Sequence, residues 1–134
     1  MSEPVLPNVT EANAPFWEGC AAGELRVQAC DRCGLLRYPI APWCPRCLAE
    51  ECTWTPLSGD GEVLSTLVFH QRYHPAWADR LPYNVVLVQL DEGPRMLSNV
   101  TPLSETHVPV GSRVHVAFEE ESGVAIPRFR IVGT

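Results

Sequence analysis

The stretch Cys30-Asp31-Arg32-Cys33-Gly34 is followed, after a spacer, by Trp43-Cys44-Pro45-Arg46-Cys47, and together they read C-x2-C-x10-C-x2-C. Two cysteines separated by two residues can aim both sulfurs at one metal ion from a tight turn. Two such turns supply the four sulfurs that zinc prefers in a closed structural site. The spacer is long enough for a short strand, a bend and a return. The pattern therefore predicts a zinc ribbon with Cys30, Cys33, Cys44 and Cys47 as metal ligands.

Other uses of four cysteines are weaker alternatives. Two disulfides would suit a small secreted chain, but the N-terminus lacks the basic region and apolar run of a signal peptide. A redox C-x-x-C motif would not need a second copy. Iron held by four sulfurs, as in rubredoxin, usually has a longer spacer between the pairs. We interpret the two remaining cysteines, Cys20 and Cys52, as small, partly buried apolar side chains.

Composition limits the class of protein. The chain has 134 residues, which suits one domain or a small domain with an appendage. All ten basic residues are arginine and the net charge is −6, so the chain is a poor general binder of nucleic-acid phosphates. No apolar run approaches the ~20 residues that cross a bilayer. We expect a reducing, cytoplasmic location.

The N-terminal part, residues 1–24, is predicted to be an extended arm followed by a short helix. Asn13 can cap this helix, which would run from about Ala14 to Ala22, and Gly23 can end it. Phe16, Trp17 and Cys20 would share one apolar face of the helix. These aromatic side chains could pack on this protein or serve as exposed anchors for a partner.

Residues 25–57 are assigned to the ribbon, which begins with the alternating strand Glu24–Ala29, and residues 58–134 are assigned to a β-barrel. Glu119–Gly123 is predicted to be an acidic turn, and Pro127 indicates an edge strand or a bulge. The strands expected in the barrel are Glu62–His70, Tyr83–Leu90 (whose central run is apolar on both faces), Arg95–Val100, Arg113–Phe118 and Ile126–Ile131.

Five strands with short connections suit a barrel of the OB type. The predicted fold is therefore mostly β, with a short N-terminal helix, a rubredoxin-like zinc ribbon and a five-stranded OB-fold barrel. The longest connection, Gln71–Pro82, joins the first two barrel strands, where OB barrels usually place a binding loop.

Several short motifs resemble, in order, one known family. They are P-F-W-E (Pro15–Glu18), G-x-L (Gly23–Leu25), the cysteine pattern (Cys30–Cys47), G-x-V (Gly61–Val63), H-P-A-W (His74–Trp77), P-Y-x-V-x-L-V-x-L-D-E-G (Pro82–Gly93) and V-G (Val110–Gly111). Together they are similar to the zinc-ribbon plus OB-fold family first described as domain of unknown function 35. The resemblance covers roughly residues 13–131.

The resemblance implies a helix, ribbon and barrel architecture and a role beside acyl-CoA enzymes. Members of the family typically accompany thiolase-like proteins that form or cleave carbon–carbon bonds in acyl-CoA thioesters, including aldolases that shorten steroid side chains. The companion supplies an interface and part of the channel near the CoA, and it does not usually supply the nucleophile. The sequence agrees, because G-x-S-x-G, G-x-G-x-x-G and P-loop motifs are absent.

The loop Gln71–Pro82 gathers Arg72, His74, Trp77 and Arg80 within nine residues. Arginine suits phosphate or carboxylate groups, and a tryptophan ring can cover an adenine or an acyl chain. We therefore predict that these four residues contact the acyl-CoA that the chain shares with its partner. The alternative is that His74-Pro75-Ala76-Trp77 folds back and caps the barrel.

Two other functions remain open from the sequence. Ribbons and OB barrels often bind single-stranded nucleic acid, and the chain could act in this way if an aromatic face and a basic groove were present. It could also be a small independent enzyme that uses a histidine as general base. The residues available for these functions are Tyr73, Trp77, Tyr83, Arg72 and Arg80 for nucleic acid, and His70 and His74 for catalysis.

Overall fold

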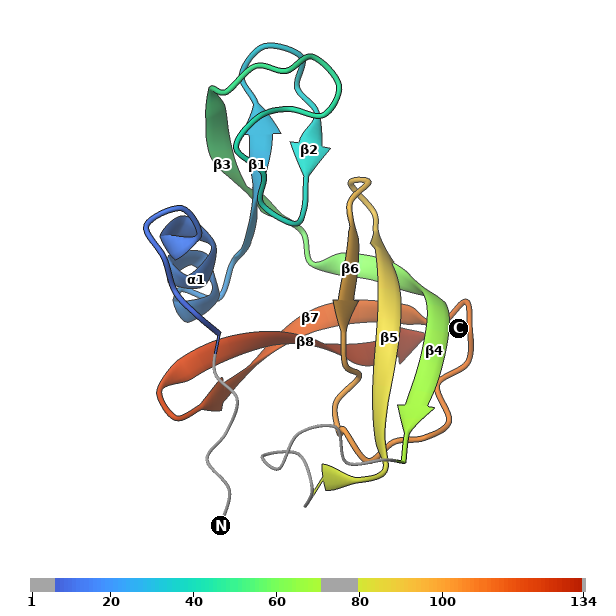
Figure 1. The fold of residues 1–134 in the computed structure, drawn as a ribbon. Helices are drawn as coiled ribbons and strands as arrows, with labels where there is room; N and C mark the ends of the chain where they lie inside the picture. Colours follow the sequence, from blue (N-terminus) through green and yellow to red (C-terminus); the bar gives the residue numbers. More distant parts are fainter. Residues whose placement is uncertain (1–6, 71–79, 134) are drawn as a thin grey trace.

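The computed structural model describes residues 7–70 and 80–133, and within them one short helix, a three-stranded sheet and a five-stranded sheet (Figure 1). The elements are α1 (Ala14–Ala21), β1 (Leu25–Cys30), β2 (Leu36–Arg37), β3 (Cys52–Leu57), β4 (Asp60–Phe69), β5 (Tyr83–Leu90), β6 (Arg95–Ser98), β7 (Arg113–Glu121) and β8 (Val124–Gly133). The predicted fold class, mostly β with a helix, a ribbon and an OB barrel, is confirmed.

The small sheet has the strand order β2-β1-β3 and forms the ribbon. Both pairings are antiparallel, and Cys30 at the end of β1 lies opposite Cys52 at the start of β3. The turn Ser58-Gly59 then leads directly into the large sheet. Gly59 has φ +84, and a Cβ atom there would collide with the Val116 side chain. Ribbon and barrel are therefore joined by a short connection that packs tightly on β7.

The large sheet has the strand order β6-β5-β4-β7-β8 and closes on itself between its two end strands. Val100, just after β6, forms a parallel bridge to Phe129 in β8. The Phe129 N–H donates to the Asn99 carbonyl at 2.9 Å, and the Thr101 N–H donates to the Phe129 carbonyl at 2.8 Å. The barrel interior is apolar and includes Val63, Val86, Val88, Leu90, Met96, Val100, Val114 and Phe129.

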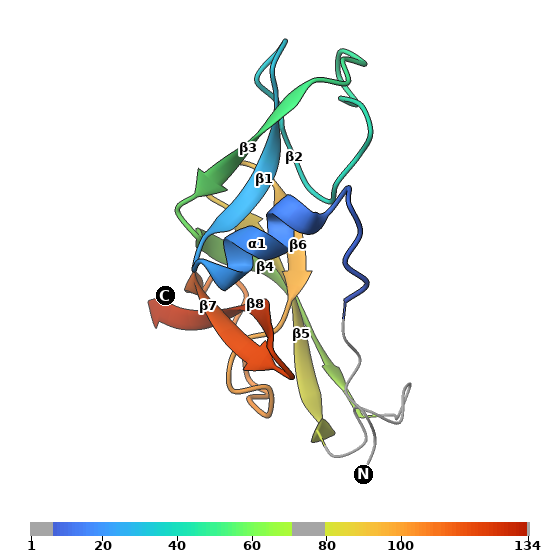
Figure 2. The same ribbon diagram turned by 90° about the vertical axis from the view of Figure 1, so that its left-hand side faces the viewer.

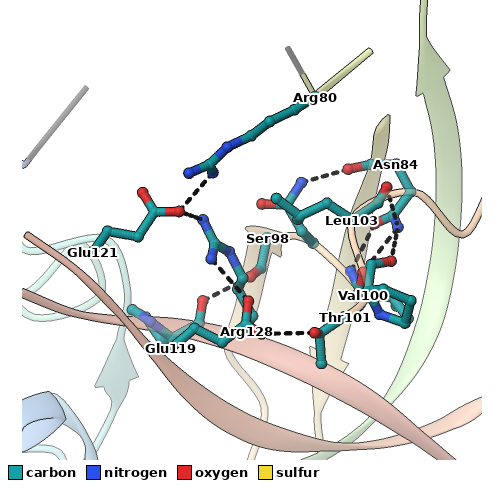
Figure 3. A network of polar contacts seen from close by, with 12 residues as sticks. Arg80, Asn84, Ser98, Val100, Thr101, Leu103, Glu119, Glu121 and Arg128 are labelled. Atoms are coloured by element: carbon teal, nitrogen blue, oxygen red, sulfur yellow. Dashed lines mark hydrogen bonds and ion pairs between the residues drawn. The ribbon is translucent and has the colours of Figure 1, made fainter. Parts of the chain in front are cut away.

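One polar side chain is completely buried inside this barrel. Asn84 at the start of β5 has 0% exposure, and its Oδ1 accepts the Val100 N–H at 2.7 Å. Its Nδ2 donates into a group of backbone carbonyls that belong to the connection between β6 and β7 (Figure 3). Asn84 therefore holds this connection, residues 99–112, against the barrel.

Helix α1 packs on the barrel and on the base of the ribbon (Figure 2). Phe16 is only 5% exposed, and its ring centroid lies 5.7 Å from that of Tyr38 and 5.0 Å from that of Trp17. Of the two alternatives left open by the sequence, Phe16 therefore packs on this protein, because the ring completes the core between ribbon and barrel. The one described helix is also far too short to cross a membrane.

The helix ends differ slightly from the sequence expectation. Asn13 precedes the helix, but its side chain does not cap it: the Oδ1 accepts the Thr10 N–H at 2.7 Å instead. The helix ends at Ala21, and Gly23 follows with φ +80, as expected for a residue that stops a helix. Asn13 was misassigned because its partner belongs to the turn before the helix.

The acidic stretch before Ser122 was also misassigned. Glu119–Glu121 are not a turn but the last part of β7, and the hairpin turn contains only Ser122 and Gly123. Pro127 lies in β8, at the end of the strand order, as predicted for an edge strand. The carboxylates of Glu119 and Glu121 have a partner that keeps them in the strand, as described below.

Candidate metal centre and binding loop

The first cysteine pair forms a tight loop at the end of β1. The Gly34 N–H donates to the Cys30 carbonyl at 2.9 Å, and the Cys30 N–H donates to the Leu35 carbonyl at 2.9 Å. The Cys33 N–H points at the Cys30 sulfur, with 3.5 Å between the two atoms. Gly34 has φ +78, which only glycine adopts at little cost. These bonds turn both sulfurs to the same side of the loop.

The second pair repeats this loop with the same hydrogen bonds. The Leu48 N–H donates to the Cys44 carbonyl at 2.8 Å, and the Cys44 N–H donates to the Ala49 carbonyl at 2.8 Å. Leu48 occupies the position that Gly34 has in the first loop, and it adopts φ +67 without being glycine. Its side chain is 70% exposed. The two loops are therefore equivalent half-sites.

The four sulfurs of these loops lie together at the tip of the ribbon. The Sγ atoms of Cys30, Cys33, Cys44 and Cys47 all lie within 4.8 Å of one another. Two separations of 3.5 Å cross between the loops and join Cys30 to Cys47 and Cys33 to Cys44. A tetrahedral zinc–sulfur site with bonds of about 2.3 Å has edges of about 3.8 Å. The donor set and its spacing therefore fit a zinc ion.

Hydrogen bonds to the sulfurs favour thiolates in the first loop. The Cys33 N–H is the main cause that lowers the pKa of Cys30, and the Leu35 N–H, followed by Arg46, lowers the pKa of Cys33 to about 6. Although the Ala49 N–H lowers the pKa of Cys47, burial and the neighbouring thiols raise it to about 11. Four adjacent thiols cannot all ionise without a cation, so a bound metal ion is what would let all four sulfurs act as thiolates.

A buried arginine, which sequence reasoning missed, holds the spacer between the half-sites. Arg37 in β2 is 5% exposed, and its Nε donates to the Gln28 Oε1 at 3.1 Å. Its Nη2 donates to the Ala41 carbonyl at 3.2 Å, while the Ala41 N–H donates to the same Gln28 oxygen at 2.9 Å. The spacer is thus tied to β1 three residues before Cys44. An isolated arginine in a two-residue strand gave no signal for this role.

The loop predicted to contact acyl-CoA is only partly described. Arg72, His74 and Trp77 lie outside the described residues, so their predicted contacts stay predictions. Arg80 lies at the end of the loop, and its Nη1 is 2.5 Å from the Glu121 Oε1 (Figure 3). The structure therefore ties the end of this loop to the tip of the β7–β8 hairpin.

The same glutamate belongs to a larger network centred on a buried arginine. Arg128 is 4% exposed, and it donates at 2.8 Å to Glu119 and at 2.8 Å to Glu121. Thr101 donates its hydroxyl to the other oxygen of Glu119 at 2.7 Å. Two arginines and two glutamates balance in charge, which makes the burial of Arg128 tolerable.

This network lowers the pKa of both glutamates. Burial would raise the pKa of Glu119, but hydrogen bonds from Thr101 and Arg128 hold it below 4.5, its ordinary value. Burial likewise opposes the shift at Glu121, where Arg128 and Arg80 lower the pKa. A carboxyl group with a lowered pKa in the folded state stabilises the fold above its ordinary pKa and loses that contribution as the pH falls. The link between loop and hairpin is therefore firm at neutral pH.

Comparison with known families agrees with this architecture. Residues 17–51 match the domain described as the ChsH2 rubredoxin-like zinc ribbon, and residues 54–119 match the C-terminal OB-fold domain of ChsH2. A solved structure described as an Ltp2-ChsH2(DUF35) aldolase has 31% sequence identity and a TM-score of 0.83, and covers 94% of this chain and 98% of that chain. The chain belongs to the DUF35 family. The resemblance stated from the sequence is thereby confirmed.

Relatives of this chain include acyl-CoA hydratase subunits and a DUF35 scaffold protein. A probable enoyl-CoA hydratase alpha subunit of Thermomonospora curvata is 32% identical over 92% of this chain and 39% of that protein. A 3-oxo-4,17-pregnadiene-20-carboxyl-CoA hydratase alpha subunit of Mycobacterium tuberculosis is 31% identical over 84% of this chain and 35% of that protein. A DUF35 domain-containing scaffold protein of Methanocaldococcus jannaschii is 28% identical over 66% of this chain and 63% of that protein. The chain thus spans less than two-fifths of the two hydratase subunits.

A second solved DUF35 structure, from Sulfolobus solfataricus, is described as having unknown function. It shares 16% identity with this chain and a TM-score of 0.65, and covers 92% of this chain. At this identity the likeness shows the common fold alone.

Proposed function

We propose that the chain is a companion subunit of a thiolase-like enzyme that forms or cleaves carbon–carbon bonds in acyl-CoA thioesters. The observation that carries the proposal is the likeness, over 98% of that chain, to the DUF35 chain of an Ltp2-ChsH2(DUF35) aldolase. The names of the hydratase relatives support acyl-CoA, including a steroid acyl-CoA, as the substrate class. In this function the companion supplies an interface and the partner supplies the nucleophile.

The proposal predicts that the chain forms a stable complex and has little activity alone. The test mixes the purified chain with Ltp2, measures the mass of the assembly by size exclusion with light scattering, and assays carbon–carbon cleavage of a steroid acyl-CoA. We expect a hetero-oligomer whose activity needs both proteins. The proposal would be overturned if this chain turned over the acyl-CoA at the full rate without a partner, or if no complex formed at micromolar concentrations.

We also propose that the loop Gln71–Pro82 contributes to acyl-CoA binding, through Arg72, His74, Trp77 and Arg80. Position supports this proposal, because OB barrels bind near the loop between their first two strands. Arg72→Ala and Trp77→Ala, made separately in the assembled complex, should raise the KM for acyl-CoA or lower kcat by about 10-fold, the usual effect of one lost anchoring contact. Melting temperature and assembly should stay unchanged. Wild-type kinetics in both variants would instead make the loop a cap on the barrel.

We propose that zinc occupies the four-cysteine centre in a structural role. The ligands would be Cys30, Cys33, Cys44 and Cys47, whose sulfurs lie within 4.8 Å of one another. Four thiolates leave no open position for a substrate, so zinc there stabilises the ribbon rather than taking part in the reaction.

The zinc proposal predicts that the two remaining cysteines are dispensable for the metal. Cys20 lies in α1 and is 1% exposed, and the Cys52 sulfur lies 3.6 Å from the Gln28 Nε2. Neither belongs to the sulfur cluster found among residues 7–70 and 80–133. Cys20→Ala and Cys52→Ala should each retain one zinc ion per chain, measured by elemental analysis. Loss of zinc from either variant would contradict the four-cysteine assignment.

A further inference from the structure

The outer surface of the strands β4, β5 and β6 carries aliphatic side chains where a barrel normally shows polar ones. Leu67, Val85, Leu87 and Leu97 point outwards there, and we call them the aliphatic face. The register pairs Leu67 with Val85 and Leu87 with Leu97, so the four lie on adjoining strands. Leu67 is 60% exposed and Leu97 is 67% exposed. Because β5 also buries Val86 and Val88 inside the barrel, it is apolar on both sides, as its sequence indicated.

The aliphatic face carries no formal charge. On β4 its outward neighbours are Ser65, which lies opposite Leu87, and Phe69, which lies opposite Tyr83 beyond Leu67 and Val85. Charged residues begin at one end of the face, where Glu62 and Arg95 both lie opposite Gln89. In Figure 1 the strands β6, β5 and β4 turn this side towards the viewer, and no other described element crosses it. Exposed, contiguous aliphatic side chains with a polar rim are typical of protein interaction surfaces.

The position of the face in the fold also indicates a binding role. In an OB barrel the second and third strands, here β5 and β6, form the surface that takes the ligand. Single-stranded nucleic acid needs stacking rings and a positive groove on this surface. The rings of Phe69 and Tyr83 adjoin the aliphatic face, but none of its four members carries a positive charge. An uncharged aliphatic surface favours an apolar patch of another protein instead.

The net charge of the chain favours a different protein, rather than a second copy of this chain, as the partner on the aliphatic face. Each chain carries a net charge of −6. Two copies packed face to face would therefore bring together two acidic bodies, with no charges on the face itself to offset their repulsion. A partner that is neutral or basic around an apolar patch would not meet this repulsion.

We infer that the aliphatic face is the surface through which the chain docks on its thiolase-like partner, and that the partner presents an uncharged, apolar patch there. This inference rests on the proposed function and adds to it the place of contact. Leu67 and Leu97, the most exposed members, are the side chains that lose the most solvent contact in the complex.

The test places a charge on the face without disturbing the core. Leu67→Lys and Leu97→Lys are made singly and together, and Val110→Lys is the matched control. Val110 is 64% exposed, and its neighbour Gly111 hydrogen-bonds to Val63 of β4, on the edge away from β5. Binding to Ltp2 is measured by calorimetry, and folding by thermal melting. Each face variant should weaken binding by about 10- to 100-fold, and the control by less than twofold.

Each result decides between the two proposals. If wild-type chain binds Ltp2 and all three variants bind equally well, the aliphatic face is not the interface, while the companion function stands. If wild-type chain does not bind Ltp2, the companion function fails and the docking face fails with it. If the chain alone is a dimer that Leu97→Lys dissociates, a second copy occupies the face and the inference is overturned.

A measurement on wild-type protein guards against a folding defect in the variants. Hydrogen exchange of the β6 amides, residues 95–98, should slow at least fivefold when Ltp2 is added, because β6 forms one border of the face. Unchanged exchange at β6, with slowing confined to another surface, would assign the interface to that surface.

Discussion

Replacing Cys44 with serine should release the metal and unfold the ribbon. Cys44 is completely buried and supplies one of four sulfurs that lie within 4.8 Å of one another. Structural zinc supplies on the order of 10 kcal/mol to a small domain, which exceeds what a three-stranded ribbon gains from its own core. Elemental analysis should find no zinc, and circular dichroism should show loss of β-structure.

The loss of stability in Cys44→Ser should extend to the barrel. Leu57 at the end of β3 packs against the barrel core, and only Ser58 and Gly59 separate β3 from β4. The barrel should therefore melt at a lower temperature in Cys44→Ser. Cys52→Ser is the matched control, because Cys52 lies opposite Cys30 in the same sheet but outside the sulfur cluster. A Cys44→Ser protein with full zinc and an unchanged melting temperature would contradict the proposed ligand set.

Asn84→Asp should destabilise the barrel by about 3–5 kcal/mol at neutral pH, the usual cost of burying an unpaired charge. The Asn84 Nδ2 lies 2.8 Å from the Val100 carbonyl oxygen, 3.3 Å from that of Pro102, 3.1 Å from that of Leu103 and 2.9 Å from that of Glu105. Aspartate would replace this donor with an oxygen that faces four other oxygens. Urea denaturation would measure the loss in the free energy of unfolding.

The pH dependence of the destabilisation shows whether the buried charge of Asn84→Asp causes it. Repulsion from the carbonyl oxygens and burial would both raise the pKa of an aspartate at position 84, so the folded state would hold a proton that the unfolded state releases. The destabilisation should therefore shrink as the pH falls from 7 towards 5. Asn84→Leu is the control, because it removes the hydrogen bonds without a charge, and its loss should not depend on pH. Equal, pH-independent losses would show that charge burial is not the cause.

Local patterns predicted those parts of the fold whose partners are close in sequence. Tyr83–Leu90 was correctly predicted as a strand because its β-branched and aliphatic residues favour a strand whatever the neighbouring elements are. The cysteine half-sites were found because their spacing alone sets the geometry. That spacing also predicted the four-sulfur cluster of the candidate site. The predicted CoA-binding loop is described only from Arg80 onwards.

Features that depend on distant partners were missed. Glu119 and Glu121 were assigned to a turn because three consecutive glutamates resemble a solvated loop. They belong to β7 because Arg128 pairs with both across the hairpin. Whether Phe16 packs on this protein or on a partner stayed open because its helix has too few residues to show which side faces the barrel. Asn84, central to the barrel, has no local signature at all.

The equivalence of the two cysteine loops has a consequence for metal exchange. Each loop is a bidentate ligand, and the second loop binds at an effective concentration set by the ten-residue spacer between Cys33 and Cys44. The hydrogen bonds of Arg37 and Gln28 to Ala41 shorten the free part of that spacer, so a loop that lets go of the ion stays beside it and rebinds. A chelator can remove the ion only if it captures the half-released state. A bound metal ion should therefore leave the ribbon more slowly than it would leave either loop alone. The ribbon would keep such an ion through encounters with competing ligands.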